Sequence, residues 1–272
     1  MKKDLEAEFA EVEARRKVIA RKERRKTLMR KVASITGGVI GWHIMSHTVM
    51  IHVPDPIETV TGAFWAVQKI YFYKSTIYSV YRVYTGFAIG CLVGVPLGLL
   101  MGWNRTIRDF TFPAFEMVRP APPVSWVPLS ILVLAKMEIS IIFLPFLGTF
   151  EYSTLNAKLG AESIDESMFR AAKCLGASPL QIFRHIVIPG ALPHIFMGLA
   201  IAMGMAWITI VAAEMISGTY GIGYMCWQSY NLIRYPEVIL FMVTIGFLGY
   251  GSSALIRILA NKFLAWRVVY KA

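Results

Sequence analysis

Cysteine is scarce in this sequence, and its spacing argues against two kinds of protein. The chain has three cysteines in 272 residues, Cys91, Cys174 and Cys226, and they form no C-x-x-C pair. Three scattered thiols give no disulfide framework and no cysteine-based metal site, so we interpret them as packing residues. A G-x-x-x-x-G-K-[ST] segment, which would bind nucleotide phosphates, is also missing. We therefore expect a chain that holds no cofactor and hydrolyses no ATP by itself.

Charged side chains are missing from several long stretches of the chain. The charge-free stretches are Val32–Pro54, Val83–Asn104, Pro120–Ala135, His185–Ala213 and Val238–Ile256. A helix needs about 20 apolar residues to cross a bilayer, so each stretch is a candidate span. A sixth candidate is Ile139–Phe150, extended through the weakly polar "EYSTLNA". With a hydrophobic content of 56%, we predict an all-α polytopic membrane protein with about six transmembrane helices.

Basic residues outnumber acidic ones, and many of them precede the first candidate span. The net charge is +11, and "RRKVIARKERRKTLMRK" at 15–31 carries much of it. The positive-inside rule places such a segment in the cytoplasm. We interpret it as a topology anchor, with binding to lipid head groups or to a partner as the alternative. We expect residues 1–31 to form a charged cytoplasmic helix, residues 32–272 to form the membrane domain, and both termini to be cytoplasmic.

Glycine and proline mark two adjoining segments. Glycines recur every fourth residue at Gly86, Gly90, Gly94, Gly98 and Gly102. This spacing places them on one helix face, where small residues let another membrane helix approach closely. The next segment, "RPAPPVSWVPL" at 119–129, holds four prolines and cannot form a regular helix. We interpret it as lining a transport pathway, with a buried structural kink as the alternative.

A further helix is predicted to begin at "PDPIE". Asp55 is the expected N-cap, Pro56 the first helical residue and Glu58 the capping-box partner. We expect this helix to continue to Tyr73 and, because it is rich in aromatic residues, to lie at the membrane interface.

Residues 164–189 predict two short helices on the cytoplasmic side. Ile164, Met168 and Leu175 recur at helical spacing and give one apolar face. Gly176 ends the first helix, and Ser178 with Gln181 forms a capping box for the second. A second turn is expected at Pro189, before the chain enters the membrane. A single amphipathic helix lying on the bilayer is the alternative.

These motifs resemble a known family. Two alanines, three residues, a glycine, and then a dozen residues to "IP" resemble the EAA loop of binding-protein-dependent ABC importer permeases. The segments "LGASPLQIFRHIVIPGALPHI", "RPAPPVSWVPL" and "AAEMISGTYGIGY" are similar to the branch that imports nitrate, alkanesulfonates, taurine or bicarbonate. The resemblance covers roughly residues 75–260. It implies a type I ABC importer permease in a bacterial inner membrane, working as a pair with ATPase subunits and an extracytoplasmic binding protein.

The resemblance also implies which residues contact the ATPase. The expected coupling residues are Arg170, Ala171, Ala172, Leu175, Gly176, Ala177, Ser178, Pro179, Phe183 and Pro189. In the family a glutamate opens the loop, whereas this chain has Arg170 there. We expect Arg170 to act through its charge at the ATPase surface.

Ionisable residues near the spans are candidates for the pathway or the gate, because a charge in lipid is costly. Glu214 is expected to hold the "SGTYGIGY" loop through backbone amides or Arg234, with an interfacial glutamate of no role as the alternative. Glu151 is interpreted as a paired charge rather than a pathway residue. For Arg82 and Arg119, contact with lipid phosphates at the interface is the alternative. The full expected pathway and gate set is Arg82, Arg119, Pro122, Trp126, Pro128, Glu214, Gly221 and Gly223.

Two other classes of protein are alternatives to a permease. An ion-coupled secondary transporter predicts inverted repeats and paired charges in the middle of the membrane, and the sequence shows neither. A membrane enzyme needs a metal cluster or an acid/base pair, for which His43, His47 and His52 are the one suggestive set. Since no carboxylate or cysteine adjoins these histidines in the sequence, we expect no metal site.

Overall fold

The computed structural model describes residues 2–48, 53–134, 136–217 and 219–264, and every regular element within these ranges is helical. The all-α prediction is therefore confirmed. The long helices are α1 (Lys2–Thr48), α3 (Ile70–Trp103), α6 (Met137–Glu162), α9 (Ile188–Ser217) and α11 (Tyr235–Phe263). The shorter ones are α2 (Pro56–Val67), α4 (Arg105–Val118), η1 (Pro123–Trp126), α5 (Val127–Val133), α7 (Glu166–Cys174), α8 (Pro179–Ile182), η2 (Phe183–Val187) and α10 (Ile222–Asn231).

The chain divides into two compact units, Met1–Gly62 and Ala63–Ala272. In the first unit, α1 runs for 47 residues and joins the basic segment to the first apolar stretch in one helix. Residues 49–52 of that stretch lie outside the described part. The expected division at residue 31, between a cytoplasmic helix and a membrane domain, stays a prediction.

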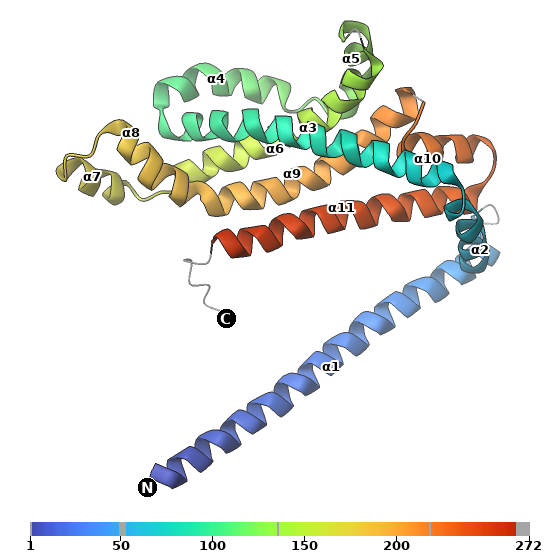
Figure 1. The fold of residues 1–272 in the computed structure, drawn as a ribbon, viewed down its shortest axis with the longest axis horizontal. Helices are drawn as coiled ribbons and strands as arrows, with labels where there is room; N and C mark the ends of the chain where they lie inside the picture. The colour runs from blue at the N-terminus through green and yellow to red at the C-terminus, as the bar shows by residue number, and fades with distance from the viewer. Residues whose placement is uncertain (1, 49–52, 135, 218, 265–272) are drawn as a thin grey trace. The chain divides into compact units, whose positions relative to one another are not determined.

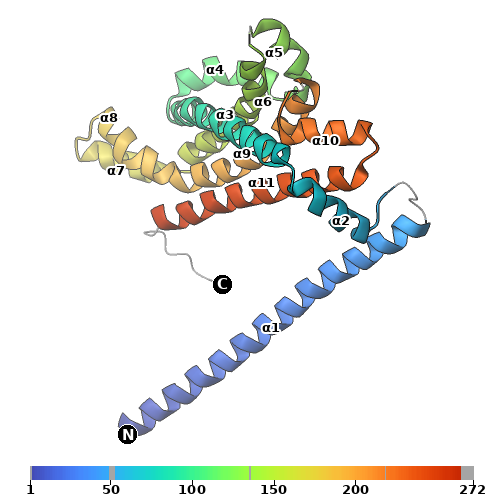
Figure 2. The ribbon, with the colours of Figure 1, turned by 45° about the vertical axis from the view of Figure 1, so that its right-hand side comes forward.

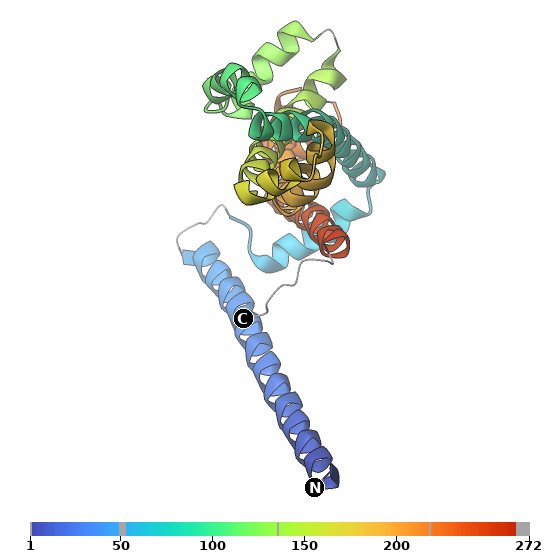
Figure 3. The same ribbon diagram turned by 90° about the vertical axis from the view of Figure 1, so that its left-hand side faces the viewer.

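The second unit is a bundle in which α3, α6, α9 and α11 lie side by side lengthwise (Figures 1 and 3). A buried cluster at its centre includes Val83, Leu144 and Trp207, from α3, α6 and α9. The α7–α8 segment lies at one end of this bundle, whereas α10 lies at the opposite end (Figures 1 and 2). The bundle therefore presents different segments at its two ends.

The glycine stripe of α3 packs against α6, as predicted. A Cβ atom on Gly86 would lie 2.7 Å from the Cβ atom of Pro145, and one on Gly102 would lie 2.6 Å from the carbonyl oxygen of Lys158. At Gly98 it would collide with the carbonyl oxygen of Thr154. Both helices run in the same direction along this contact, because the partner numbers rise together. Only glycine allows so close an approach of the two backbones.

Three described segments are long and apolar enough to cross a membrane: α3, the continuous run Pro179–Ile216, and α11. The candidate span Pro120–Ala135 has no helix long enough to cross a membrane among its described residues. Four residues of η1 and seven of α5 replace it. At 1.5 Å per residue α5 is about 10 Å long, against a hydrocarbon core of about 30 Å. The proline-rich backbone breaks the helix there, as the composition indicated.

The helix that begins at Pro56 is shorter than expected. Its N-cap is confirmed, because the backbone N–H of Glu58 donates to the Asp55 carboxylate at 2.6 Å. It ends at Val67, and a new helix, α3, begins at Ile70. Tyr73 therefore belongs to α3, and the expected single aromatic helix is corrected to two.

Candidate functional site

Helix α7 begins with a capped N-terminus. The carboxylate of Asp165 accepts a hydrogen bond from the backbone N–H of Ser167 at 2.8 Å. That hydrogen bond lowers the pKa of Asp165 below its ordinary value. The cap therefore stabilises α7 above the ordinary aspartate pKa, and this contribution is lost as the pH falls through the lowered value. Near neutral pH the start of the helix is well defined.

The predicted bend at Gly176 is present. This residue has φ of +78°, the left-handed region that glycine adopts readily. The N–H of Gly176 donates to the carbonyl of Lys173, and the N–H of Ala177 donates to the carbonyl of Ala172, both at 3.0 Å. This is the Schellman pattern of a helix C-terminus. The turn between α7 and α8 is therefore built by backbone hydrogen bonds.

The capping box that begins the second helix is also confirmed. The N–H of Gln181 donates to the Ser178 hydroxyl at 3.4 Å, and the N–H of Ser178 donates to the Gln181 side chain at 2.7 Å. Pro179 occupies the first turn, where its missing N–H leaves no helical hydrogen bond unmade. The helix–bend–helix interpretation is thus correct up to this point.

The second turn expected at Pro189 is wrong. The helix continues from α8 through the π-helical turn η2 into α9 without a break. Proline lacks an N–H and its ring crowds the carbonyl four residues earlier, and a wider π turn directly before it relieves both conflicts. The helix–bend–helix segment is therefore continuous with the long apolar helix α9.

The apolar side chains of this segment divide between buried and exposed positions. Phe169 and Ile182 turn inward, and the ring of Phe183 packs 4.9 Å from that of Trp103. Leu175, by contrast, is 88% exposed at the bend, and Met168 is 52% exposed. The predicted apolar face therefore points partly outward, with Leu175 exposed next to the glycine bend.

Next to the bend, Cys174 is exposed rather than packed, which corrects its assignment as a packing residue, whereas Cys226 is buried.

Arg170 is exposed and lines a groove of about 700 Å³ with Glu162, Glu166 and Lys173. The tip of the segment thus combines exposed apolar side chains with charges of both signs.

At the opposite end of the bundle, Arg82 forms a buried ionic network. Its side chain is 1% exposed. It donates to both oxygens of Glu138, each at 2.7 Å, and to a carboxylate oxygen of Glu214 at 2.9 Å. It also donates to the carbonyl oxygen of Tyr220 at 2.6 Å. One guanidinium therefore connects α3, α6, α9 and the loop before α10.

Glu214 contacts the end of that loop through one backbone amide directly and a second through Ser79, in line with one of the two options from the sequence. The N–H of Gly223 donates to its carboxylate at 2.9 Å, and the Ser79 hydroxyl donates at 2.8 Å. The N–H of Ile222 donates in turn to the Ser79 oxygen at 2.8 Å. Because Glu214 is buried, these donors and Arg82 replace water around its charge.

The loop packs so closely against α9 that two of its positions require glycine. Gly221 has φ of +131°, and a Cβ atom there would collide with the Glu214 carboxylate. A Cβ atom on Gly223 would lie 2.6 Å from the carbonyl oxygen of Val211. Both glycines therefore belong to the same structure as Arg82 and Glu214.

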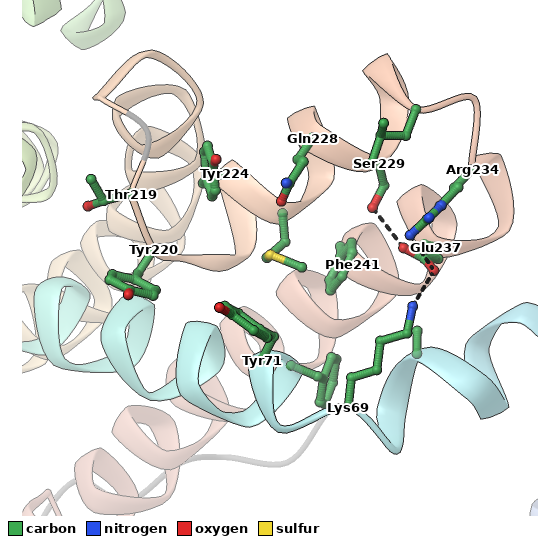
Figure 4. Close-up of a pocket in the computed structure, with 14 residues that line it drawn as sticks. Lys69, Tyr71, Thr219, Tyr220, Tyr224, Gln228, Ser229, Arg234, Glu237 and Phe241 are labelled. Atoms are coloured by element: carbon green, nitrogen blue, oxygen red, sulfur yellow. Dashed lines mark hydrogen bonds and ion pairs between the residues drawn. The ribbon is translucent and has the colours of Figure 1, made fainter.

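Arg234 was the second expected partner of Glu214, but its Nη1 atom instead lies 3.9 Å from the Oε1 atom of Glu237. Figure 4 shows this region, a pocket of about 350 Å³ between α3, α10 and α11. Lys69 and Ser229 both donate to Glu237 at 3.0 Å. The pocket is thus framed by an ion-pair cluster that is separate from the Arg82 network.

The remaining pathway candidates lie near α4 and α6. Arg119 donates to Glu151 at 3.3 Å, so Glu151 is a paired charge, as interpreted from the sequence. Both line a mainly apolar pocket of about 260 Å³ together with Trp126. Pro122 precedes η1 and Pro128 lies in the first turn of α5. The structure therefore does not bring these residues together with Arg82.

Sequence reasoning missed three members of the network. Ser79 and Glu138 belong to no motif identified in the sequence and are 59 residues apart, whereas Tyr220 lies in the "SGTYGIGY" segment, although nothing in that segment predicts its carbonyl contact with Arg82. One local signal existed: Ser79 precedes Arg82 by three residues, so both lie on one helix face. Glu138 and Tyr220 are brought to that face only by the packing of the bundle.

Apolar helices that run the length of the bundle, one of them continuous with a helix–bend–helix segment that has an exposed tip, are features of a membrane transport permease. The sequence model described as "Binding-protein-dependent transport system inner membrane component" matches residues 94–269. The chain belongs to this family.

Curated relatives agree with this assignment. The chain is 32% identical to a probable ABC transporter permease protein of Brucella abortus, over 86% of this chain and 94% of the relative. It is 30% identical to the bicarbonate transport system permease protein CmpB of Synechococcus elongatus, over 86% of each chain. It is 28% identical to the nitrate import permease protein NrtB of Synechocystis, over 88% of this chain and 87% of the relative.

Solved structures show the same fold. An inward-facing form of the MetNI methionine ABC transporter matches with a TM-score of 0.56 at 18% identity, covering 69% of this chain and 92% of the other. A second crystal form of that transporter matches with a TM-score of 0.52 at 16% identity, covering 75% and 99%. The predicted type I ABC importer permease fold is therefore confirmed.

Proposed function

We propose that this chain is the transmembrane permease subunit of an ATP-driven importer for a small anion such as nitrate, bicarbonate, taurine or an alkanesulfonate. Two copies would form the pathway, ATPase subunits would bind the α7–α8 segment, and an extracytoplasmic binding protein would deliver the substrate. The observation that carries the proposal is the exposed, capped bend at Gly176, joined without a break to α9. The nitrate and bicarbonate permeases among the relatives support the anion.

The continuous helix suggests how force would be transmitted. Because Pro179–Ile216 is a single run, movement of the bend would move the α9 end that carries Glu214. In this proposal the Arg82 network holds the outer gate closed, since it connects the Glu214 end of α9 to α3, α6 and the loop before α10. If the chain is inserted in a bacterial inner membrane with both termini in the cytoplasm, the bend lies on the cytoplasmic side and the Arg82 network lies on the outer side.

The proposal is tested by purifying the chain alone and after co-expression with an ABC ATPase subunit. The permease alone is expected to hydrolyse no ATP, and the complex to import anions only when the binding protein is present. Uptake of labelled nitrate, bicarbonate, taurine and an alkanesulfonate into proteoliposomes distinguishes the substrates. ATP turnover by the isolated chain, or import of only neutral or cationic solutes, would contradict the proposal.

Gly176→Val is expected to abolish most transport while the protein still inserts. Nothing lies within 4 Å of the added Cβ position, so the effect comes from backbone conformation alone. A β-branched residue disfavours φ of +78° by about 1–2 kcal/mol and would shift the angle between α7 and α8. Uptake and ATPase co-purification measure the effect. Gly176→Asn is the matched control, because asparagine tolerates the left-handed region; equal transport by both variants would show that the bend angle is unimportant.

Arg170→Glu is expected to weaken ATPase association by about fivefold or less, corresponding to about 1 kcal/mol for an exposed charge. The side chain is exposed beside the bend and makes its contribution by charge, so high salt should reduce the difference between variant and wild type. Recovery of the ATPase at low and high salt measures it, with Arg170→Gln as the neutral intermediate. Equal recovery of all three proteins would identify Arg170 as a neutral surface residue.

A further inference from the structure

The end of α1 and the start of α2 bring together three side chains that can bind a metal ion. His43 and His47 lie one turn apart on α1, and Asp55 precedes α2. One possible ligand atom from each lies within 4.8 Å of the other two. The Nδ1 atom of His43 is 4.0 Å from the Oδ2 atom of Asp55. The sequence shows no carboxylate adjoining these histidines, but the fold supplies one.

Hydrogen bonds orient two of the three groups. The Nδ1 atom of His47 lies 3.0 Å from the carbonyl oxygen of His43, and a carbonyl oxygen can only accept a hydrogen bond. A neutral imidazole with its proton on Nδ1 satisfies this contact, accepts no hydrogen bond from the Ser46 hydroxyl 3.2 Å away, and keeps the lone pair of Nε2 for a metal. A backbone carbonyl on the second ring nitrogen is the usual support of a metal-bound histidine.

Asp55 is fixed in the same way. Its Oδ1 atom accepts the N–H of Glu58 at 2.6 Å, which leaves Oδ2 facing His43. The indole N–H of Trp42 donates to the carbonyl of Pro54 at 3.2 Å, and this contact holds the residue before Asp55 against α1. The carboxylate thus approaches the histidine pair from a second helix.

We propose that His43, His47 and Asp55 form a binding site for a divalent transition metal ion, with Zn²⁺ as the best match. Two imidazoles at a spacing of four residues and one carboxylate are common zinc ligands, and water completes a tetrahedron. Ligand atoms around a tetrahedral Zn²⁺ are about 3.3 Å apart. The His43 ring therefore has to move by about 1 Å, and it has room to do so because its side chain is half exposed. Hard cations such as Mg²⁺ prefer oxygen ligands and are disfavoured here.

Such a site would act as a clamp between two helices. The bound ion would join the last turns of α1 to the first residue before α2, so it would restrict the connection between the two helices. This inference rests only on residues of the first compact unit and is independent of the proposed import activity. His52 lies outside the described residues and is given no role.

The test measures zinc bound by the full chain, purified in detergent on a tag without histidine. Dialysis against buffered Zn²⁺ followed by elemental analysis is expected to give one ion per chain. His43→Ala, His47→Ala and Asp55→Asn should each weaken binding by about tenfold or more, because each removes a ligand or its charge. Asparagine is also a good N-cap, so Asp55→Asn preserves the start of α2.

His185→Ala is the matched control, since it removes an exposed histidine from the α8–η2 run and should leave zinc binding unchanged. Substitution of Co²⁺ gives a second readout, because its visible absorption reports a tetrahedral site and should disappear in the three ligand variants. A wild-type chain that binds no zinc, or binding that survives all three substitutions, would overturn the proposal.

Discussion

Arg82→Met is expected to be among the most damaging single substitutions in this protein. It removes the one described guanidinium that contacts both Glu138 and Glu214, and leaves the carboxylate of Glu214 buried without a cation. Breaking a buried ion pair from one side costs about 3–5 kcal/mol, because the remaining charge has lost its water and its partner. We expect a protein that unfolds at a much lower temperature and has lost transport, measured by thermal unfolding in detergent and by uptake.

The matched variants separate the charge effect from simple loss of packing. Glu214→Gln added to Arg82→Met removes the uncompensated charge, so the double variant should be more stable than Arg82→Met alone. Glu138→Gln should cost about 1 kcal/mol or less, since Glu138 is 43% exposed and Arg82 keeps Glu214 as its anionic partner. If the double variant is no more stable than the single one, the carboxylate of Glu214 is not charged in the folded protein and the ionic interpretation fails.

Local patterns in the sequence predicted much of the fold. The glycine stripe identified the packed face of α3 because its spacing of four residues matches the helix repeat. Gly176 and Ser178 identified the bend because capping depends only on residues next to each other along the chain. Family resemblance added the permease class, which composition could not supply.

Contacts between distant residues could not be predicted in the same way. Arg82 meets Glu138 and Glu214 only because three helices pack together, and no sequence spacing encodes that. The continuity of the helix through Pro189 depends on the π turn before it, which has no simple sequence signal. The approach of Asp55 to His43 likewise depends on how the chain returns after α1.

Gly98→Ala is expected to destabilise the bundle although it adds only one methyl group. The Cβ atom would collide with the Thr154 carbonyl oxygen and lie 2.8 Å from the Cβ atom of Ala157. A backbone carbonyl cannot rotate away as a side chain can, so α3 and α6 would have to separate along the whole stripe. Overpacking of this kind costs about 1–3 kcal/mol. The unfolding temperature in detergent should fall, and transport should fall with it.

Gly246→Ala on α11 makes the same chemical change with nothing within 4 Å of the new Cβ atom. Alanine is favoured over glycine inside a helix by roughly 0.5–1 kcal/mol, so this control should leave stability unchanged or raise it. The two glycine-to-alanine variants are thus expected to shift the unfolding temperature in opposite directions. A Gly98→Ala protein as stable as the Gly246→Ala protein would mean that α3 and α6 are not packed backbone to backbone, and the glycine stripe would then need another explanation.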